Sequence, residues 1–252
     1  MRLDQYLVER DFFKSRNKAK QAIDNNAIEI NGKIISKASY DVLDTDIVKV
    51  VGEVCPYVSR GGYKLEGAIK AFFLDFHDKV VVDIGASTGG FTDCSLQHGA
   101  KLVYSIDVGT NQLDESLRNN PRVISMENTN IKDVMYFKED IDYLVMDVSF
   151  VSITNLILDI SRFINQNNSL VCLIKPQFEV GKMYLKNGIV KDKNLHVKVI
   201  ENIMKVLSNY GLFITKLIPS PILGGSGNKE YLALVKRDKF VNINVLEVVK
   251  GC

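Results

Sequence analysis

Two lysines and two carboxylates, far apart in the sequence, could together carry out acid–base chemistry: Lys64, Asp147, Lys175 and Glu230. Asp147 and Lys175 each close an apolar run of the kind that forms a buried strand. A lysine in that position is partly buried, and burial favours the neutral amine that can accept a proton. Taken singly, each residue is more often a structural ion-pair partner, so the candidate reaction centre depends on all four together.

A glycine-rich turn follows the apolar run Val80–Ile84 and indicates a site for a nucleotide-like ligand. The turn runs from Gly85 to Gly90, with Ser87 where the dinucleotide-binding pattern G-x-G-x-x-G has its second glycine. Glycine allows the backbone to turn tightly and to approach a ligand closely. The alternative is an ordinary turn between a strand and a helix. The residues expected to bind a ligand here are Asp83, Gly85, Ser87 and Gly89.

Two further residues could complete that site. Asp107 lies about twenty residues beyond the glycine turn, the spacing at which an acid can bind ribose hydroxyls. This spacing is common to nicotinamide proteins and S-adenosylmethionine (SAM) proteins, and the alternative is a turn-forming Asp at a strand end. Asn128, just after another predicted strand, could reach an adenine ring, although a local turn explains its position equally well.

Strand-like and helix-like segments alternate from about residue 59 onward. The alternation predicts a mostly parallel, doubly wound α/β sheet of the Rossmann type, with ligands outside the carboxyl ends of the strands. Asp83, Asp107, Asp147 and Lys175 are all expected to end strands there. The predicted helices are Ser152–Ile164 and Leu195–Tyr210, and the predicted strands are Val80–Ile84, Leu102–Asp107, Arg122–Met126, Tyr143–Asp147, Leu170–Lys175, Phe213–Ile218 and Tyr231–Val235.

Residues 1–54 are typical of a separate small α+β domain, which the linker 55–58 joins to a larger domain at 59–252. Two helical segments precede a hairpin, signalled by Asn31-Gly32, and a last strand at Asp46–Val50. Five cations and one acid occupy the segment Arg10–Lys20, where Ser15 is a candidate N-cap. A solvated helix face explains such a charge run, and so does a surface that binds RNA or DNA phosphates.

The composition excludes several classes of protein. With 252 residues and a formal net charge of +2, the chain can bury a full core but lacks bulk basicity, so a nucleic-acid surface must come from local clustering. The four cysteines and three histidines are scattered without a C-x-x-C pair, which argues against a metal site or a disulfide framework and fits the reducing cytoplasm. No signal-peptide pattern or long uncharged apolar stretch is present, so we expect no membrane association.

The N-terminal segment resembles the S4-like RNA-binding domain of ribosomal and RNA-modifying proteins. The resemblance is carried by Ser15-Arg16-Asn17-Lys18-Ala19, by the apolar residues that follow, and by Asn31-Gly32-Lys33. It implies that cations of this domain, and one at the start of the next, contact RNA. The residues assigned to RNA contact are Arg2, Lys14, Arg16, Lys18, Lys20 and Arg60.

The four charged residues resemble the Lys-Asp-Lys-Glu tetrad of FtsJ-type ribose 2′-O-methyltransferases. The whole chain is similar to the TlyA family, some of whose members carry a haemolysin name. This similarity implies SAM as the cofactor and 2′-O-methylation of cytidine in ribosomal RNA, within ribosomal subunits or the 70S ribosome, as the reaction. The segments that carry it are Ser59–Leu65, Asp83–Asp93, Asp107–Leu113, Asp147–Phe150, Ile174–Glu179 and Gly227–Tyr231.

A ribose hydroxyl is a weak acid, so its proton must leave as the methyl group arrives. We expect Lys175 to be the base and Asp147 to position it, while Lys64 and Glu230 orient the hydroxyl. Because a neighbouring carboxylate favours a charged lysine, Lys64 stays a close competitor. Amine methylation usually requires Pro-Pro and an aromatic residue after the corresponding acid, a pattern this sequence lacks. Cys94 and Cys172 look like packing residues rather than nucleophiles, which leaves oxygen as the acceptor.

Two other functions stay open at the level of the sequence. One is a non-catalytic assembly factor that binds ribosomal RNA and has a vestigial pocket. The other is a membrane-active lytic protein, which the lack of a spanning segment disfavours. The polar segment Phe178–Asn194 is either an RNA-contacting lid or a mobile surface loop. The sequence does not fix the modified nucleotide, the choice between one or both ribosomal subunits, or the oligomeric state.

Overall fold

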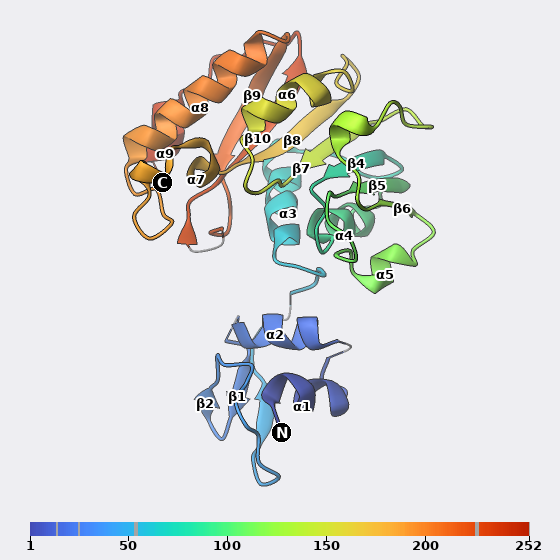
Figure 1. The fold of residues 1–252 in the computed structure, drawn as a ribbon, viewed down its shortest axis with the longest axis vertical. Coiled ribbons are helices and arrows are strands. Elements are labelled where there is room, and N and C mark those ends of the chain that lie inside the picture. Colours follow the sequence, from blue (N-terminus) through green and yellow to red (C-terminus); the bar gives the residue numbers. More distant parts are fainter. Residues whose placement is uncertain (14, 25, 53–54, 225–226, 252) are drawn as a thin grey trace. The chain divides into compact units, whose positions relative to one another are not determined.

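The computed structural model describes all residues except 14, 25, 53–54, 225–226 and 252 (Figure 1). The chain divides into two units, Met1–Ser59 and Arg60–Cys252. Each unit has its own sheet and its own buried apolar cluster. The chemistry-bearing residues of the predicted reaction centre all belong to the larger unit.

The N-terminal unit contains two helices and a three-stranded antiparallel sheet of order β2-β1-β3. Leu3, Leu7 and Ile23 of the helices are fully buried in its core. The hairpin turn has positive φ at Asn31 (50°) and Gly32 (80°), as a type I′ turn requires. The predicted helix–helix–hairpin order is thus confirmed. The elements are α1 (Leu3–Glu9), α2 (Arg16–Asp24), β1 (Ile28–Ile30), β2 (Lys33–Ile34) and β3 (Val48–Val50).

A seven-stranded sheet of order β6-β5-β4-β7-β8-β10-β9 forms the centre of the larger unit. The first five strands in this order are parallel, and β10 is antiparallel to both of its neighbours. With its first strand central and its order reversing there, the parallel part is a doubly wound Rossmann-type sheet, as predicted. The strands are β4 (Val80–Ile84), β5 (Leu102–Ile106), β6 (Val123–Met126), β7 (Tyr143–Met146), β8 (Ser169–Ile174), β9 (Leu212–Pro219) and β10 (Tyr231–Arg237).

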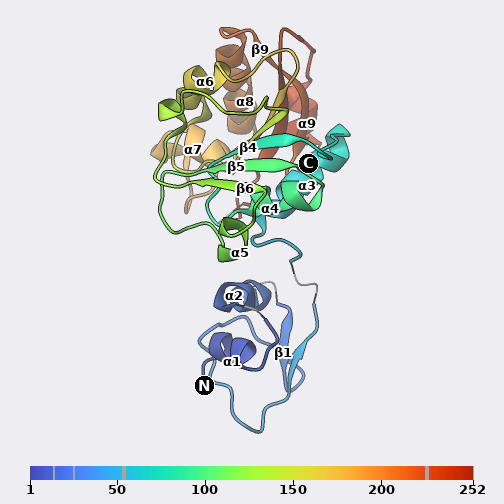
Figure 2. The ribbon, with the colours of Figure 1, turned by 90° about the vertical axis from the view of Figure 1, so that its right-hand side faces the viewer.

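Helices cover both faces of this sheet (Figures 1 and 2). α3 (Gly61–Phe72) and α4 (Gly90–Gln97) pack together on one face, while α6 (Ile153–Ser161), α8 (Lys193–Ser208) and α9 (Val245–Lys250) cover the other. Within the described residues, no helix is long and apolar enough to cross a membrane. The short elements are α5 (Glu115–Arg118), α7 (Pro176–Glu179) and the 3-10 helices η1 (Ile131–Asp133) and η2 (Lys182–Tyr184).

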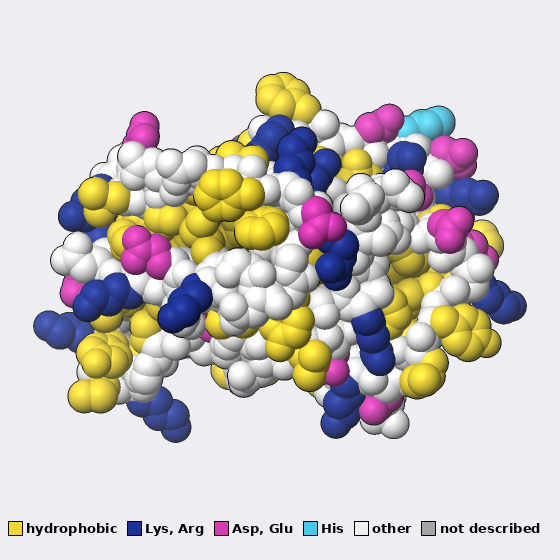
Figure 3. All heavy atoms as spheres, turned by 90° about the horizontal axis from the view of Figure 1, so that it is seen from above, with side chains coloured by type: hydrophobic (Ala, Val, Ile, Leu, Met, Phe, Trp, Pro, Cys, Tyr) yellow, Lys and Arg dark blue, Asp and Glu magenta, His cyan; other side chains and the backbone are white. Residues whose placement is uncertain are grey.

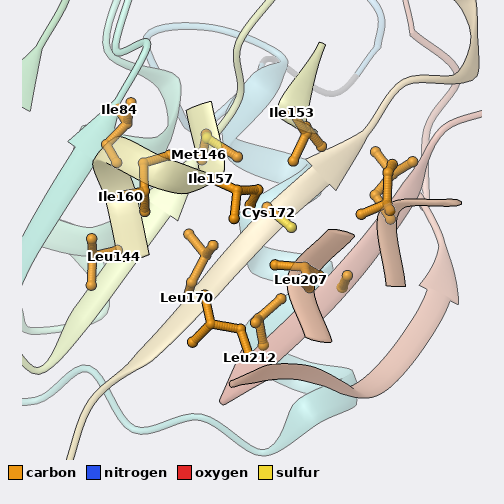
Figure 4. Close-up of a cluster of buried hydrophobic side chains, with 14 of the residues drawn as sticks. Ile84, Leu144, Met146, Ile153, Ile157, Ile160, Leu170, Cys172, Leu207 and Leu212 are labelled. Carbon is orange, nitrogen blue, oxygen red and sulfur yellow. The ribbon is translucent and has the colours of Figure 1, made fainter. Parts of the chain in front are cut away.

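The main core lies between the sheet and the helices α6 and α8 (Figure 4). Side chains alternate between the two faces along a strand, and here Ile84, Met146 and Cys172 of three strands meet Ile157 of α6 and Leu207 of α8. Because helices cover both faces, the central strands are apolar nearly throughout. This burial fixes the strands rigidly and so fixes the loops that leave their ends.

Polar residues leave the sheet at the carboxyl ends of its parallel strands. Asp107, Asp147 and Lys175 directly follow the last residues of β5, β7 and β8. Asp83 differs from the prediction, because it lies inside β4 and its side chain is fully buried. Its carboxylate accepts a hydrogen bond from Thr92 Oγ1 of α4 at 2.7 Å. Asp83 therefore joins the central strand to a covering helix instead of standing at the open edge.

Candidate active site

Lys64, Asp147, Lys175 and Glu230 meet at the carboxyl edge of the parallel strands. Asp147 and Lys175 arrive there from β7 and β8. Glu230 directly precedes β10, whose antiparallel direction places its beginning at the same edge. Lys64 lies in the first turn of α3, and 166 positions of sequence separate it from Glu230. The fold thus assembles the tetrad that the sequence resemblance predicted.

The four side chains form a continuous series of ion pairs. Lys175 Nζ lies 2.5 Å from Asp147 Oδ1, and Lys64 Nζ lies 3.7 Å from Oδ2 of the same carboxylate. Lys64 Nζ also donates to Glu230 Oε2 at 2.7 Å. Lys64, Lys175 and Glu230 are buried, with 8%, 7% and 3% of their surface exposed. Two positive and two negative charges therefore balance where water is largely excluded, which offsets the desolvation cost of each.

The surroundings of the two lysines differ. Lys64 has a carboxylate on each of two sides. Among the described residues Lys175 forms an ion pair with one carboxylate, that of Asp147. Lys175 Nζ also donates to Ser149 Oγ at 2.7 Å, and the Phe178 ring centre lies 5.8 Å away. Ser149 was not predicted as a site residue, although it lies within the segment that identified Asp147.

A cavity of about 550 Å³ opens beside Asp147 and Ser149 at the ends of β4, β5 and β7. Asp107 stands at its polar side, where the carboxylate accepts hydrogen bonds from the backbone N–H groups of Ser87 at 2.8 Å and Gly109 at 2.7 Å. An ionised carboxylate has about four acceptor positions, so Asp107 retains capacity for ribose hydroxyls. The apolar residues of the lining are Ile84, Ile106, Val108, Ile131, Val148, Phe150, Val151 and Leu156.

The backbone at Gly85 explains why a glycine begins the turn. Its φ is 81°, and a Cβ at this position would lie 3.0 Å from Val148 Cγ1 and 3.1 Å from the carbonyl oxygen of Asp147. A side chain there would press on the β7 loop that carries Asp147. The cavity has an acidic group that can bind hydroxyls and apolar walls that can contact a planar base. It therefore fits a nucleoside such as the adenosine part of SAM.

The six residues predicted to bind the cofactor divide into two sets of three. Gly85, Ser87 and Asp107 line the cavity, whereas Asp83, Gly89 and Asn128 are absent from its lining. Gly89 has φ 100°, and a Cβ there would lie 2.3 Å from Leu117 Cδ1, so the glycine permits packing against α5.

Asn128 also serves the local backbone. It has φ 52°, and its N–H donates to the Gly109 carbonyl at 2.9 Å. The residues from this segment that line the cavity are the next three, Thr129, Asn130 and Ile131. The asparagine that lines the cavity is therefore Asn130, two positions beyond the one that the sequence suggested.

Phe150 projects from the loop that follows β7. It lines the cavity, its side chain is 91% exposed, and its φ of 65° is a left-handed conformation that a bulky residue rarely adopts. Its ring centre lies 5.1 Å from that of Phe178, which follows Lys175 by three positions. The two rings place an exposed aromatic surface at the mouth of the site.

The segment Phe178–Asn194 is anchored in its second half. The N–H of Val190 donates to Asn228 Oδ1 at 3.2 Å, and Asn228 Nδ2 donates to the Gly188 carbonyl at 2.9 Å. His196 Nε2 lies 2.9 Å from the Val190 carbonyl, and burial lowers the pKa of His196, so that this imidazole is neutral near pH 7 and donates there. Asn228 lies two residues before Glu230, so the segment is tied to the loop that delivers a tetrad residue.

Two cations of the N-terminal unit, Arg2 and Arg16, are held in place by Asp4, a buried residue that was not predicted from the sequence. Asp4 is 0% exposed and accepts hydrogen bonds from Arg2 Nε at 3.0 Å and from Arg16 Nη2 at 2.6 Å. The hydrogen bond from Arg2 lowers the pKa of Asp4 to about 2. Ser15 Oγ caps α2 by accepting from the Lys18 N–H at 3.3 Å, as predicted.

The other residues predicted to contact RNA differ in their exposure. Lys20 and Arg60 are exposed and Lys18 is half-buried, while Lys14 lies outside the described residues. On the face of the molecule in Figure 3, lysine and arginine side chains are scattered among apolar, neutral and acidic ones. That face carries no single basic patch, in line with the small net charge of +2.

Two family models match the chain. The S4 domain model matches residues 1–48, and the FtsJ-like methyltransferase model matches residues 57–237. The chain belongs to the FtsJ-like methyltransferase family. Its N-terminal part is an S4 domain, and both predicted resemblances are confirmed.

Several relatives match nearly the whole chain. Hemolysin A of Brachyspira hyodysenteriae is 43% identical over 92% of this chain and 98% of its own. The 16S/23S rRNA (cytidine-2′-O)-methyltransferase TlyA of Mycobacterium tuberculosis H37Rv is 36% identical over 91% of this chain and 87% of its own. The similarity to the TlyA and haemolysin A proteins predicted from the sequence is confirmed.

Solved structures agree on the fold. A protein from Streptococcus thermophilus, provisionally called a hemolysin, has a TM-score of 0.79 and 38% identity, and the match covers 100% of this chain and 94% of that one. A protein from Listeria monocytogenes, provisionally called a SAM-dependent methyltransferase, shares the fold with a TM-score of 0.52 and 16% identity over 72% of this chain and 100% of that one.

Proposed function

We propose that this protein transfers a methyl group from SAM to the ribose 2′-hydroxyl of a cytidine in ribosomal RNA, within ribosomal subunits or the assembled ribosome. The observation that carries the proposal is the ion-pair series Lys175–Asp147–Lys64–Glu230, in which three residues are buried and Asp147 is half-buried, beside a nucleoside-sized cavity. The TlyA relative of Mycobacterium tuberculosis supports the substrate through its name, 16S/23S rRNA (cytidine-2′-O)-methyltransferase. Because the proposed substrate is ribosomal RNA, the activity would take place in the cytoplasm.

The cavity residues would hold SAM by its nucleoside. Asp107 would accept hydrogen bonds from the ribose hydroxyls, and the apolar walls at Ile106 and Ile131 would contact the adenine ring. When bound there, SAM supplies a methyl group activated on a positively charged sulfur. Because Asp147 and Ser149 line the same cavity, the reacting hydroxyl can lie between this methyl group and Lys175.

Lys175 is the proposed base. In its neutral form Nζ would take the proton of the 2′-hydroxyl as this oxygen receives the methyl group, which SAM held by the cavity residues would supply. Asp147 and Ser149 hold the resulting ammonium group at 2.5 and 2.7 Å. Lys64, fixed between two carboxylates, stays a cation and stabilises the negative charge that develops on the oxygen.

The S4 domain would bind the RNA substrate. Arg2 and Arg16 converge on Asp4, which holds both guanidinium groups in fixed positions on one side of the unit. Both guanidinium groups, with Lys20 one turn beyond Arg16 on the same helix face, suit contacts to phosphate oxygens, and Lys18 of the same helix is also proposed to contact RNA. Arg60, at the start of α3, is proposed to contact RNA in the larger unit.

The test is transfer of labelled methyl from SAM to unmethylated small subunits, large subunits and assembled ribosomes, with Lys175→Ala alongside. We expect label on at least one substrate and its loss in the variant. Lys79→Ala is the matched control, because Lys79 pairs with Asp142 at 3.1 Å at the opposite edge of the sheet. Binding of SAM without methyl transfer to any of the three substrates would contradict the proposal and support the non-catalytic assembly factor.

A further inference from the structure

Gln177 is a buried amide beside the tetrad that the proposed reaction does not use. It is the second residue of α7, is 9% exposed, and its Nε2 lies 2.9 Å from Glu230 Oε1. An ionised carboxylate can only accept hydrogen bonds, so the NH₂ side of the amide must face Glu230. Among the described residues, Gln177 donates to Oε1 of Glu230 and Lys64 donates to Oε2.

The chain connects Gln177 rigidly to the proposed base. Lys175 follows the last residue of β8 directly, and Pro176 separates it from Gln177. Proline fixes its own φ and restricts the residue before it, so the two side chains leave the strand in a set relation. Lys175 contacts Asp147 at one end of the ion-pair series, and Gln177 contacts Glu230 at the other.

The same short helix is held from its other end. Glu179, the last residue of α7, accepts hydrogen bonds from Ser152 Oγ at 2.5 Å and from the Ile153 N–H at 2.8 Å, at the start of α6. α7 is thereby tied to the loop that carries Asp147. A side chain on α7 cannot shift without disturbing these contacts, which makes Gln177 a fixed point for Glu230.

We propose that Gln177 is a positioning residue for methyl transfer: it holds the Glu230 carboxylate in the orientation that keeps Lys64 charged and in place. The inference depends on the proposed function, since it assigns Gln177 a part in that reaction. Without the amide donor, Glu230 would lose one of the two side-chain hydrogen bonds that the described residues give it, and it could rotate away from Lys64. Lys64 would then retain only Asp147, at 3.7 Å.

The experiment measures methyl transfer to ribosomal RNA by Gln177→Met, which keeps the length of the side chain and removes the donor. We expect kcat to fall by about tenfold or more, with SAM affinity and the KM for RNA within about twofold of the unsubstituted protein. Gln166→Met is the matched control. Gln166 Nε2 also faces a carboxylate, Asp238, at 3.4 Å, but on the exposed surface before β8, and its loss should leave kcat unchanged.

A double-mutant cycle separates positioning from a general structural role. If Gln177 acts through Glu230, adding Gln177→Met to Glu230→Gln should change kcat by less than about twofold. Full activity of Gln177→Met, or losses that multiply in the double variant, would overturn the inference. A loss of SAM binding or of cooperative unfolding in Gln177→Met would also overturn it. If the unsubstituted protein transfers no methyl group, the proposed function itself fails, and the inference falls with it.

Discussion

At the scale of single residues, the two tetrad lysines differ in the number of carboxylates around them. Lys64 lies between Glu230 and Asp147, whereas Lys175 has Asp147 and the neutral hydroxyl of Ser149. Removing the positive charge of Lys64 would leave the buried Glu230 and the half-buried Asp147 with weakened compensation. This difference between the two lysines is the reason that we propose Lys175, and not Lys64, as the base.

Arginine substitutions distinguish these two roles. An arginine keeps the positive charge but does not lose its proton in proteins. We therefore expect Lys175→Arg to lower kcat by about 100-fold or more, while Lys64→Arg retains more activity because its role requires only charge. Single-turnover rates of methyl transfer measure the difference. A variant with Lys175→Arg that is more active than one with Lys64→Arg would assign the base to Lys64.

Asp83 has a separate effect on folding. Burial raises the pKa of its carboxyl to about 7, whereas the pKa of an aspartate in the unfolded chain is about 3.9. Between these values the folded state binds more protons than the unfolded state, so this group lowers the free energy of unfolding as pH rises from about 4 to about 7. As pH rises from about 5 to about 8, we expect the Tm of the Asp83→Asn variant to fall less than the Tm of the unsubstituted protein. Equal pH dependence of Tm in both proteins would contradict this.

At the scale of elements, the loops after β7 and β8 carry most of the site and are fastened to each other. Ser152 caps α6 by accepting from the Thr154 N–H at 3.2 Å, and Glu179 of α7 accepts from Ser152. The loop after β7 holds Asp147, Ser149 and Phe150, and it owes its position to this contact. Phe150 adopts a left-handed backbone and stays exposed there, which indicates a role outside the folded core.

Phe150→Ala tests whether that exposed ring contacts the RNA substrate. Stacking of a base on an aromatic ring contributes about 1–3 kcal/mol, so we expect kcat/KM for RNA to fall by about 5- to 150-fold, with little change in Tm. Phe73→Ala is a close control, because Phe73 is 88% exposed and has φ 57° but lies at the end of α3. Equal effects of the two substitutions on methylation would remove Phe150 from the substrate site.

The elements of the larger unit could be predicted from sequence because their signals are local. Buried strands are apolar runs, and Ser152 and Asp192 begin α6 and α8 as N-caps close to the expected ends. Gln177, Asp4 and Ser149 were missed because their importance comes from partners that are distant in sequence, such as Glu230 and Arg16.

The remaining differences arise from the direction of side chains. Asp83 was placed at the ligand edge because it is nearly last in its strand, but strand alternation turns it toward α4 and Thr92. Gly89 and Asn128 both have positive φ and do not line the cavity, so a local backbone conformation is enough to explain a glycine and an asparagine there, and their contact with a cofactor stays a prediction. The sequence shows that a glycine or asparagine is needed at such a position but not what it faces.

At the scale of the whole molecule, an S4 domain at residues 1–48 and an FtsJ-like methyltransferase part at residues 57–237 share one chain. The net charge of +2 is too small for affinity by bulk electrostatics. We therefore propose that RNA recognition comes from placed cations such as Arg2 and Arg16. The proposed binding of RNA by one domain and of a nucleoside by the other suits a modification that occurs on structured RNA.

The most direct test of the central claim is the position of the transferred methyl group in ribosomal RNA. A methyl group on the 2′-oxygen blocks attack by that oxygen on the neighbouring phosphate, so alkali leaves the chain intact at the modified nucleotide. We predict that labelled methyl will be recovered in alkali-resistant dinucleotides that begin with cytidine, and that Lys175→Ala will yield none. Label recovered on a base, in mononucleotides released by alkali, would contradict ribose methylation and the roles proposed for Lys64, Asp147, Lys175 and Glu230.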